Sequence, residues 1–250
     1  MDKADTSLDK GLVLLRMIAE DNGATAFREM ADRLNMPLST AHRILATLKD
    51  HGLVCRLGAG RYGAGIELAS LAGLPNRLAL IARVARPFLD ATARETGLTL
   101  HLGALEDGMV TYAVKAEGAP ADTAAEFTRE GMQLEAYCSA VGRVLLAGLN
   151  KSEQRSYLSD GPFVQLTTRT VTSPHRLQGI LELVSERGFA EDDREISDDL
   201  WCLAVPLRSK KGEVLCSVSA SMTWHPKAAL RKEDVIRSLQ SVVGRIGYRL

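Results

Sequence analysis

The segment from Phe27 to Tyr62 constrains the fold of this 250-residue chain more than any other part. Its pattern predicts a short helix, a turn, a second helix and a hairpin that carries arginines. This order of elements allows one helix to lie in the major groove of DNA while the hairpin touches the flanking backbone. We therefore predict a winged helix-turn-helix unit, preceded by an amphipathic helix over residues 7–20.

The second helix of this unit is predicted to have one apolar and one polar side. Pro37 suits the first turn of a helix, and the Ser39 hydroxyl can cap free amides there. The residues expected to be buried are Ala41, Ile44, Leu45 and Leu48. The residues expected on the opposite side are Ser39, Thr40, Arg43 and Thr47. Their hydroxyl, guanidinium and methyl groups suit phosphate oxygens, guanine edges and thymine methyls.

A wing is predicted after Gly52, with short strands over residues 53–56 and 61–62 around a glycine-containing turn. Thr25 is a plausible cap for the preceding helix of residues 27–34. The wing arginines are expected to contact phosphates. The predicted DNA-contacting residues are Thr25, Ser39, Thr40, His42, Arg43, Thr47, Arg56 and Arg61.

The wing glycines Gly58, Gly60 and Gly63 spell G-x-G-x-x-G, which is also the pattern of a dinucleotide-binding loop. That loop must follow a buried strand and open a helix. Here the flanking strand is polar and no helix begins at these glycines, so we interpret them as hairpin residues. Residues 33–62 carry five basic side chains and one acidic side chain, a local basic strip that suits DNA.

Composition places the whole chain among ordinary globular proteins. It has 31 basic and 31 acidic residues, and 46% of its residues are hydrophobic. No apolar run is long enough to span a membrane, and the first residues lack the apolar core of a signal peptide. The four cysteines are scattered, without a C-x-x-C pair, as in a reduced cytosolic protein. We therefore expect a cytoplasmic location.

The rest of the chain is predicted to alternate helices and strands in an α+β arrangement. A domain boundary is expected at residues 73–76, which gives a DNA-binding domain over 1–74, a connector helix over 75–96 and a further domain over 97–250. The expected strands cover residues 98–105, 109–114, 203–208 and 214–221, and the expected helices cover 139–149, 152–158, 173–187 and 232–248. Turn residues between the strands predict hairpins, and hence an antiparallel sheet with flanking helices.

Four segments together resemble the IclR-type bacterial transcriptional regulators. They are SLDKGLVLLRMIAE, MPLSTAHRILATLKDHGLV, SAVGRVLLAGL and RGFAEDDREISDDLWCLAVPLRSKKGEV. The resemblance implies a winged helix-turn-helix, a connector helix and a GAF-like effector-binding domain. It also implies that the protein binds double-stranded operator DNA as a homodimer, often paired into a tetramer, and responds to a small organic acid.

The resemblance further implies an effector pocket. Its expected residues are Tyr137, Cys138, Ser139, Ala140, Val141, Gly142, Asp192, Leu200, Cys202, Ser219 and Ser221. Backbone amides at a helix N-terminus bind a carboxylate well, and alternate residues of a strand share one face. Tyr137, Met132 and Trp201 favour an aromatic or otherwise flat carboxylate through stacking. The alternative is that Tyr137 and Trp201 only fill the core or the surface.

Other chemistry receives less support. The acidic run over residues 191–199 lacks the ligand spacing of a calcium loop, which favours a solvated loop with Asp192 turned inward. The histidines are not spaced as in a zinc site, and no G-x-S-x-G elbow is present. We therefore predict no catalytic residue, metal or cofactor. Two alternatives to a DNA-binding regulator remain: a small-molecule enzyme with a helical N-terminal appendage, and a winged helix that binds only proteins.

Overall fold

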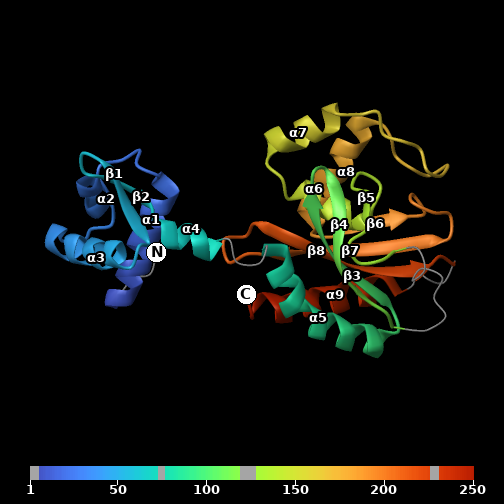
Figure 1. The fold of residues 1–250 in the computed structure, drawn as a ribbon. Helices are drawn as coiled ribbons and strands as arrows, with labels where there is room; N and C mark the ends of the chain where they lie inside the picture. Colours follow the sequence, from blue (N-terminus) through green and yellow to red (C-terminus); the bar gives the residue numbers. More distant parts are fainter. Residues whose placement is uncertain (1–5, 73–76, 119–127, 226–230) are drawn as a thin grey trace. The chain divides into compact units, whose positions relative to one another are not determined.

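The computed structural model describes residues 6–72, 77–118, 128–225 and 231–250 (Figure 1). It forms two compact units, Met1–Asn76 and Arg77–Leu250. The domain boundary expected at residues 73–76 lies outside the described residues. Each unit has its own hydrophobic core.

The first unit contains helices and one hairpin. Its elements are α1 (Ser7–Asp21), α2 (Phe27–Arg33), α3 (Leu38–Asp50), β1 (Val54–Gly58), β2 (Arg61–Ala64) and α4 (Ile66–Ala72). The core collects Leu14 and Ile18 of α1, Phe27 and Met30 of α2, and the apolar side of α3. The predicted order of helix, turn, helix and wing is therefore confirmed.

Helix α3 buries the side that its sequence predicts. Ala41, Ile44, Leu45 and Leu48 are all buried. Ser39, Arg43 and Thr47 are exposed, and Thr40 is half-buried. The helix ends at His51, and the following Gly52 adopts a φ of +67°, a conformation that glycine reaches at little cost.

Both predicted side-chain caps in this unit are wrong. The N-cap of α3 is Pro37, which has no side-chain acceptor, so Ser39 lies inside the helix and caps nothing. The N-cap of α2 is Ala26, also without a side-chain bond. Thr25 is instead tied back to the end of α1, because its amide donates to Asp21 Oδ2 at 2.7 Å.

The wing is an antiparallel pair of strands in which Val54 lies opposite Ala64 and Arg56 opposite Tyr62. Gly58 belongs to β1 and Gly63 to β2, so the glycine motif lies in a hairpin and opens no helix. The dinucleotide interpretation is accordingly excluded by the geometry.

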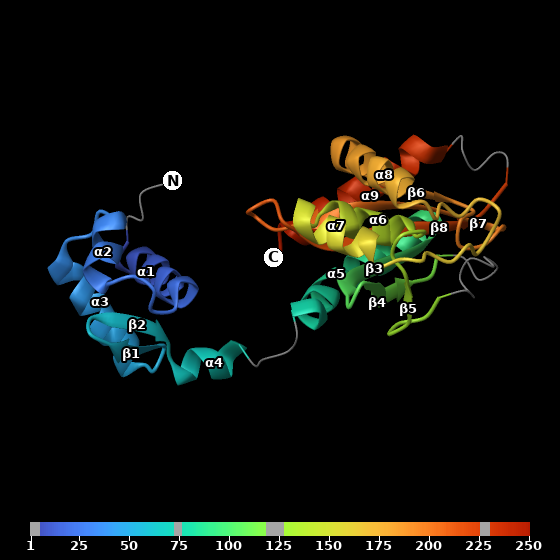
Figure 2. The same ribbon diagram turned by 90° about the horizontal axis from the view of Figure 1, so that it is seen from above.

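The second unit is built on one six-stranded antiparallel sheet in the order β5-β4-β3-β8-β7-β6 (Figures 1 and 2). Its helices are α5 (Arg77–Thr96), α6 (Ala140–Ala147), α7 (Lys151–Ser159), α8 (Pro174–Arg187) and α9 (Lys232–Gly247). Its strands are β3 (Thr99–Glu106), β4 (Met109–Ala116), β5 (Gln133–Glu135), β6 (Ala190–Asp193), β7 (Leu200–Arg208) and β8 (Val214–Thr223). The α+β class and the antiparallel sheet with flanking helices are confirmed.

Each face of this sheet has its own hydrophobic cluster (Figure 1). Helices α5 and α9 pack on one face, over Leu100, Leu203 and Val218. Helices α6 and α8 cover the other face. Helix α5, expected as a connector, packs on the sheet and belongs to the second unit.

Two strands were not predicted. β5 has only three residues, and β6 consists of the polar sequence Ala-Glu-Asp-Asp. Residues 191–193 of the acidic run are therefore strand, not solvated loop, because they pair with β7 at the edge of the sheet. The predicted inward orientation of Asp192 is confirmed, since none of its surface is exposed.

Candidate DNA-binding surface and effector cavity

The polar side of α3 presents chemically mixed groups to solvent. Arg43 is exposed and makes no ion pair with any described residue. The Thr47 hydroxyl donates to Arg43 O at 3.2 Å, so its hydrogen is used within the helix. The His42 ring packs 5.1 Å from the ring of Phe27, which fixes its position at the edge of the core. Because Pro37 caps no amide, the first-turn N–H groups of α3 lack a side-chain acceptor.

The wing arginines are exposed but partly engaged. Arg61 donates to the carbonyl oxygen of Gly23 at 2.9 Å and also to that of Ala24. Arg56 Nε makes a long contact of 3.5 Å with Gly58 O. Arg61 therefore holds the wing against the loop between α1 and α2, in addition to any contact with a ligand.

A cavity in the second unit begins at the N-terminus of α6. Ser139 is the N-cap, and its Oγ accepts a hydrogen bond from Gly142 N at 3.0 Å. The amides of Ala140 and Val141 belong to the first turn and have no partner within the helix. Ser139, Ala140 and Val141 all line the cavity. This wall is the kind of helix terminus that attracts an anion.

The opposite wall is the adjoining face of the sheet. Asp192, Cys202 and Ser221 are register partners on three neighbouring strands. The Cys202 thiol lies 3.3 Å from Ser221 Oγ. Further residues that line the cavity are Tyr112, Thr128, Leu134, Ile196, Leu200 and Ser219. The enclosed free volume is about 10 Å³, which is room for roughly one water molecule.

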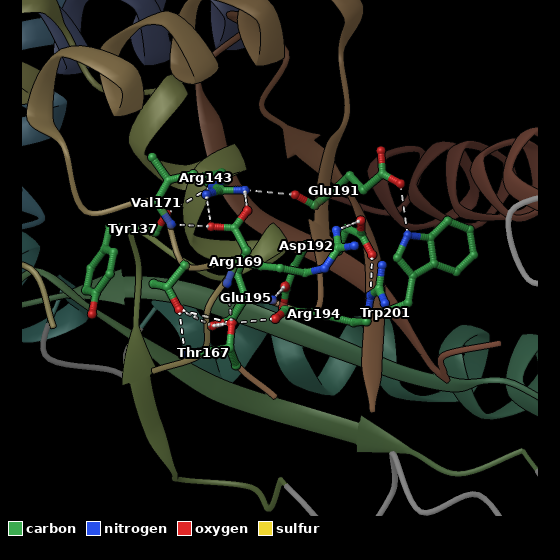
Figure 3. Close-up of polar contacts among 12 residues, drawn as sticks. Tyr137, Arg143, Thr167, Arg169, Val171, Glu191, Asp192, Arg194, Glu195 and Trp201 are labelled. Atoms are coloured by element: carbon green, nitrogen blue, oxygen red, sulfur yellow. Dashed lines mark hydrogen bonds and ion pairs between the residues drawn. The ribbon is translucent and has the colours of Figure 1, made fainter. Parts of the chain in front are cut away.

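Asp192 is the most unusual residue of the cavity (Figure 3). Its Oδ1 accepts a hydrogen bond from Glu195 N at 2.7 Å, whereas its buried Oδ2 has no partner among the described residues. Burial raises the pKa of this carboxyl to about 7, against the opposing effects of the Glu195 amide and the Arg143 guanidinium. Burial therefore disfavours the ionised form of Asp192, and one of its oxygens is available to a ligand.

Three predicted pocket residues do not line this cavity. Tyr137 is 2% exposed, packs 4.7 Å from the ring of Phe163, and donates its hydroxyl to Val164 O at 2.6 Å. Cys138 is buried, and burial raises the pKa of its thiol to about 12. Gly142 contributes its amide to the Ser139 cap but is not on the cavity surface.

The two side chains predicted to stack on the effector, Tyr137 and Trp201, also do not line this cavity. Trp201 belongs to the cluster on the far side of the sheet, and its indole nitrogen donates to Glu191 Oε1 at 2.8 Å. Met132 is not among the lining residues either. In this structure both Tyr137 and Trp201 are buried in the core, as the alternative expected.

Sequence reasoning missed Tyr112, Thr128, Leu134 and Ile196. The Tyr112 side chain could have been found from its alternation with Val110 on β4, since both belong to the α6 side of the sheet. Tyr112 packs beside His101, whose Nε2 lies 2.6 Å from Thr128 Oγ1. Burial lowers the pKa of His101 to about 3, so this histidine is neutral. No group of three metal-ligating side chains occurs within the described ranges.

Comparison with known proteins identifies both units. Residues 7–58 match the IclR helix-turn-helix domain, and residues 77–245 match the C-terminal domain of bacterial IclR transcriptional regulators. The HTH-type transcriptional regulator KdgR of Escherichia coli is 27% identical over 98% of this chain and 92% of its own length.

Solved structures share the fold. A putative transcriptional regulator from Rhodococcus sp. RHA1 superposes with a TM-score of 0.64 at 25% identity, over 97% of this chain and 96% of that one. An IclR homologue from Microbacterium hydrocarbonoxydans, solved with 4-hydroxybenzoate, gives a TM-score of 0.63 at 23% identity, over 97% of this chain and 98% of that one. No helix in the described part of the chain is long and apolar enough to cross a membrane. With both of its units matched, this chain belongs to the IclR family of bacterial DNA-binding transcriptional regulators.

Proposed function

We propose that α3 and the wing bind operator DNA, and that a small organic acid bound in the cavity of the second unit controls this binding. The observation that carries the proposal is the pairing of two kinds of group in one cavity. Free amides of the first turn of α6 form one wall, and the unpartnered oxygen of Asp192 lies on the other. A carboxylate satisfies the amides, and a hydroxyl of the same molecule satisfies Asp192.

On the DNA side, α3 presents Ser39, Arg43 and Thr47 in one exposed row. In the proposed complex Arg43 contacts a base edge, and the free amides of the first turn contact a phosphate. Thr25, Thr40, His42, Arg56 and Arg61 complete the proposed contact set. The protein acts as a homodimer, or as a pair of dimers, on an operator with two half-sites.

The chemistry of the cavity narrows the class of effector. Its free volume of about 10 Å³ admits a carboxylic acid only if lining side chains move. The homologue from Microbacterium hydrocarbonoxydans was solved with 4-hydroxybenzoate, an acid that also carries a hydroxyl. We therefore propose a hydroxylated carboxylic acid, aromatic or aliphatic, as the effector. It biases the DNA-binding arrangement through its differential affinity for two states of the protein.

An enzymatic role has no equivalent support. The Ser139 hydroxyl oxygen is occupied by Gly142 N, and His101, the buried histidine beside the cavity, packs on Tyr112 and Thr128. A nucleophile paired with an oriented base is thus not present at this cavity among the described side chains. We propose that the protein is a cytoplasmic regulator that uses no cofactor.

The first test addresses the DNA surface. Arg43→Ala is expected to weaken binding to an operator fragment by roughly 5- to 150-fold, because a lost arginine–base contact costs about 1–3 kcal/mol. Electrophoretic retention on a fragment selected from random duplexes measures the effect. Arg33→Ala is the matched control, since Arg33 is exposed in the same unit but pairs with Glu29 at 2.7 Å.

Failure of the wild-type protein, Arg43→Ala and Arg61→Ala alike to retain any duplex would favour a winged helix that binds only proteins. Turnover of an acid by the purified protein, lost in Ser139→Ala, would instead favour the enzyme alternative. Either result would overturn the regulator proposal for this chain.

The second test addresses the cavity. In a thermal-shift screen of lactate, 4-hydroxybenzoate and related hydroxy acids, a true effector at 100 times its dissociation constant is expected to stabilise the protein by about 2.7 kcal/mol. Asp192→Leu, which removes the acceptor, is expected to abolish the shift, whereas Asp193→Leu on the same strand is expected to retain it. Equal shifts in both variants would place the acid outside the cavity.

A further inference from the structure

A buried ion pair adjoins Asp192, one of the residues that line the cavity (Figure 3). The guanidinium of Arg143, on α6, and the carboxylate of Glu195, in the turn after β6, bond through two nitrogen–oxygen pairs. The distance from Arg143 Nη2 to Glu195 Oε2 is 2.7 Å, and the two side chains are only 3% and 10% exposed. Neither side chain lines the cavity.

The ion pair reaches both cavity walls through further hydrogen bonds. On the α6 side, Arg143 Nε donates to Tyr137 O at 2.9 Å, just before the Ser139 cap. On the sheet side, Arg143 donates to Glu191 O at 3.1 Å, and the amide of Glu195 donates to Asp192 Oδ1 at 2.7 Å. The two walls are therefore linked through one pair of side chains.

The same pair also anchors the segment before α8. The amide of Val171 donates to Glu195 Oε2 at 2.9 Å. The hydroxyl of Thr170 donates to Glu195 O at 2.6 Å, and that of Thr167 donates to Arg194 O at 2.7 Å. The turn that carries Glu195 is consequently fixed by three hydrogen bonds from this one segment, and Asp192 with it.

We propose that Arg143 and Glu195 form a positioning pair, which holds the Asp192 carboxyl in its place opposite the α6 amides and sets its charge. Neither residue touches the effector. This inference rests on the proposed effector cavity, and it assigns the control of that cavity to residues outside it.

The charges around Asp192 explain how such a pair works. Arg143 from α6 and Glu195 from its own turn act on it, and the other titratable groups near it are Tyr112 from β4, Cys138 before α6 and its register partner Cys202 from β7. Burial has the largest effect on the carboxyl, while Arg143 favours its ionised form and Glu195 opposes it, so the two members of the pair act on its charge with opposite signs. Removing one member therefore leaves the other uncompensated next to Asp192.

The test is the titration of Asp192 in the full chain, followed by NMR of aspartate labelled with carbon-13 at its carboxyl. The Asp192 signal is identified by its absence from Asp192→Asn, and is followed from about pH 4 to about pH 9. Glu195→Gln is expected to lower the pKa of Asp192 by about 1–3 units, and Arg143→Gln is expected to raise it by a similar amount. Loss of structure alone would not produce shifts of opposite sign.

Arg169→Gln is the matched control, because Arg169 pairs at 2.7 Å with Asp193, the exposed neighbour of Asp192, and is expected to leave the titration unchanged. Shifts in the same direction for both variants, or shifts no larger than that of the control, would overturn the proposal. If Arg143→Gln does not fold, the sign of the shift in Glu195→Gln decides. The experiment uses no effector, so its failure is distinguishable from failure of the effector screen.

Discussion

Replacing Arg143 with methionine is expected to lower the free energy of unfolding of the second unit by about 3–5 kcal/mol. The change leaves the Glu195 carboxylate buried with only the Val171 amide and no cation. It also leaves the carbonyl oxygens of Tyr137 and Glu191 without their donor. Urea denaturation followed by tryptophan fluorescence measures the loss, because both tryptophans, Trp201 and Trp224, lie in this unit.

Two companion variants test whether the loss of stability comes from the burial of the ion pair and from the charge left without a partner. Arg169→Met breaks an ion pair on the same turn whose members are 46% and 42% exposed, and is expected to cost no more than about 1 kcal/mol. The double variant with Arg143→Met and Glu195→Leu removes both buried charges and is expected to regain a large part of the stability. If Arg143→Met lowers the free energy of unfolding by no more than Arg169→Met does, the buried pair does not contribute more to the stability of the unit than an exposed pair.

The sequence was most informative where one periodicity governs a whole element. The four apolar residues predicted for the inner side of α3, Ala41, Ile44, Leu45 and Leu48, recur at helical spacing, and all four are buried because three helices meet there. Capping was harder to predict, because a cap depends on where the first turn begins. The structure starts α3 one residue after Pro37, which moves the Ser39 hydroxyl from the cap position into the helix.

The edge strand β6 shows why local composition can mislead. Its Ala-Glu-Asp-Asp sequence has the polarity of a loop, yet pairing with β7 makes it a strand. Strand alternation then turns Ala190 and Asp192 inward and leaves Glu191 and Asp193 partly exposed. Only the pairing with β7, whose partner residues lie about ten positions further along the chain, distinguishes a strand from a loop here.

The cavity proposed to bind the effector was predictable in its walls but not in its aromatic lining. Family resemblance located Ser139, Asp192 and Cys202, which all line the cavity. Trp201 could have been excluded by alternation alone, because it adjoins Cys202 on β7 and must face the other side of the sheet. The Arg143–Glu195 pair joins residues 52 positions apart and leaves no local signal in the sequence.

Gly142→Ala is expected to lower the free energy of unfolding of the second unit by about 3 kcal/mol, for a reason that spacing alone does not reveal. A Cβ at this position would lie 2.2 Å from Ala136 O and 2.3 Å from Ala136 Cα. These are backbone atoms of a fully buried residue, so a side-chain rotation cannot relieve the clash. Helix α6 would have to move away from the strand end that precedes it, and the same urea titration measures the cost.

The control for Gly142→Ala is Gly179→Ala, which places the same methyl group on α8, where no atom lies within 4 Å. There alanine is expected to raise stability by about 0.4–1 kcal/mol, since it restricts the unfolded chain without a clash. The two variants also differ in their predicted effect on the cavity. Displacing Gly142 moves the amide that donates a hydrogen bond to Ser139 Oγ, and with it the free amides of Ala140 and Val141. Gly142→Ala should therefore lose the stabilisation by hydroxy acids that Gly179→Ala retains. If Gly142→Ala is destabilised but its response to hydroxy acids is unchanged, the proposal that the amides of α6 bind the carboxylate would be contradicted.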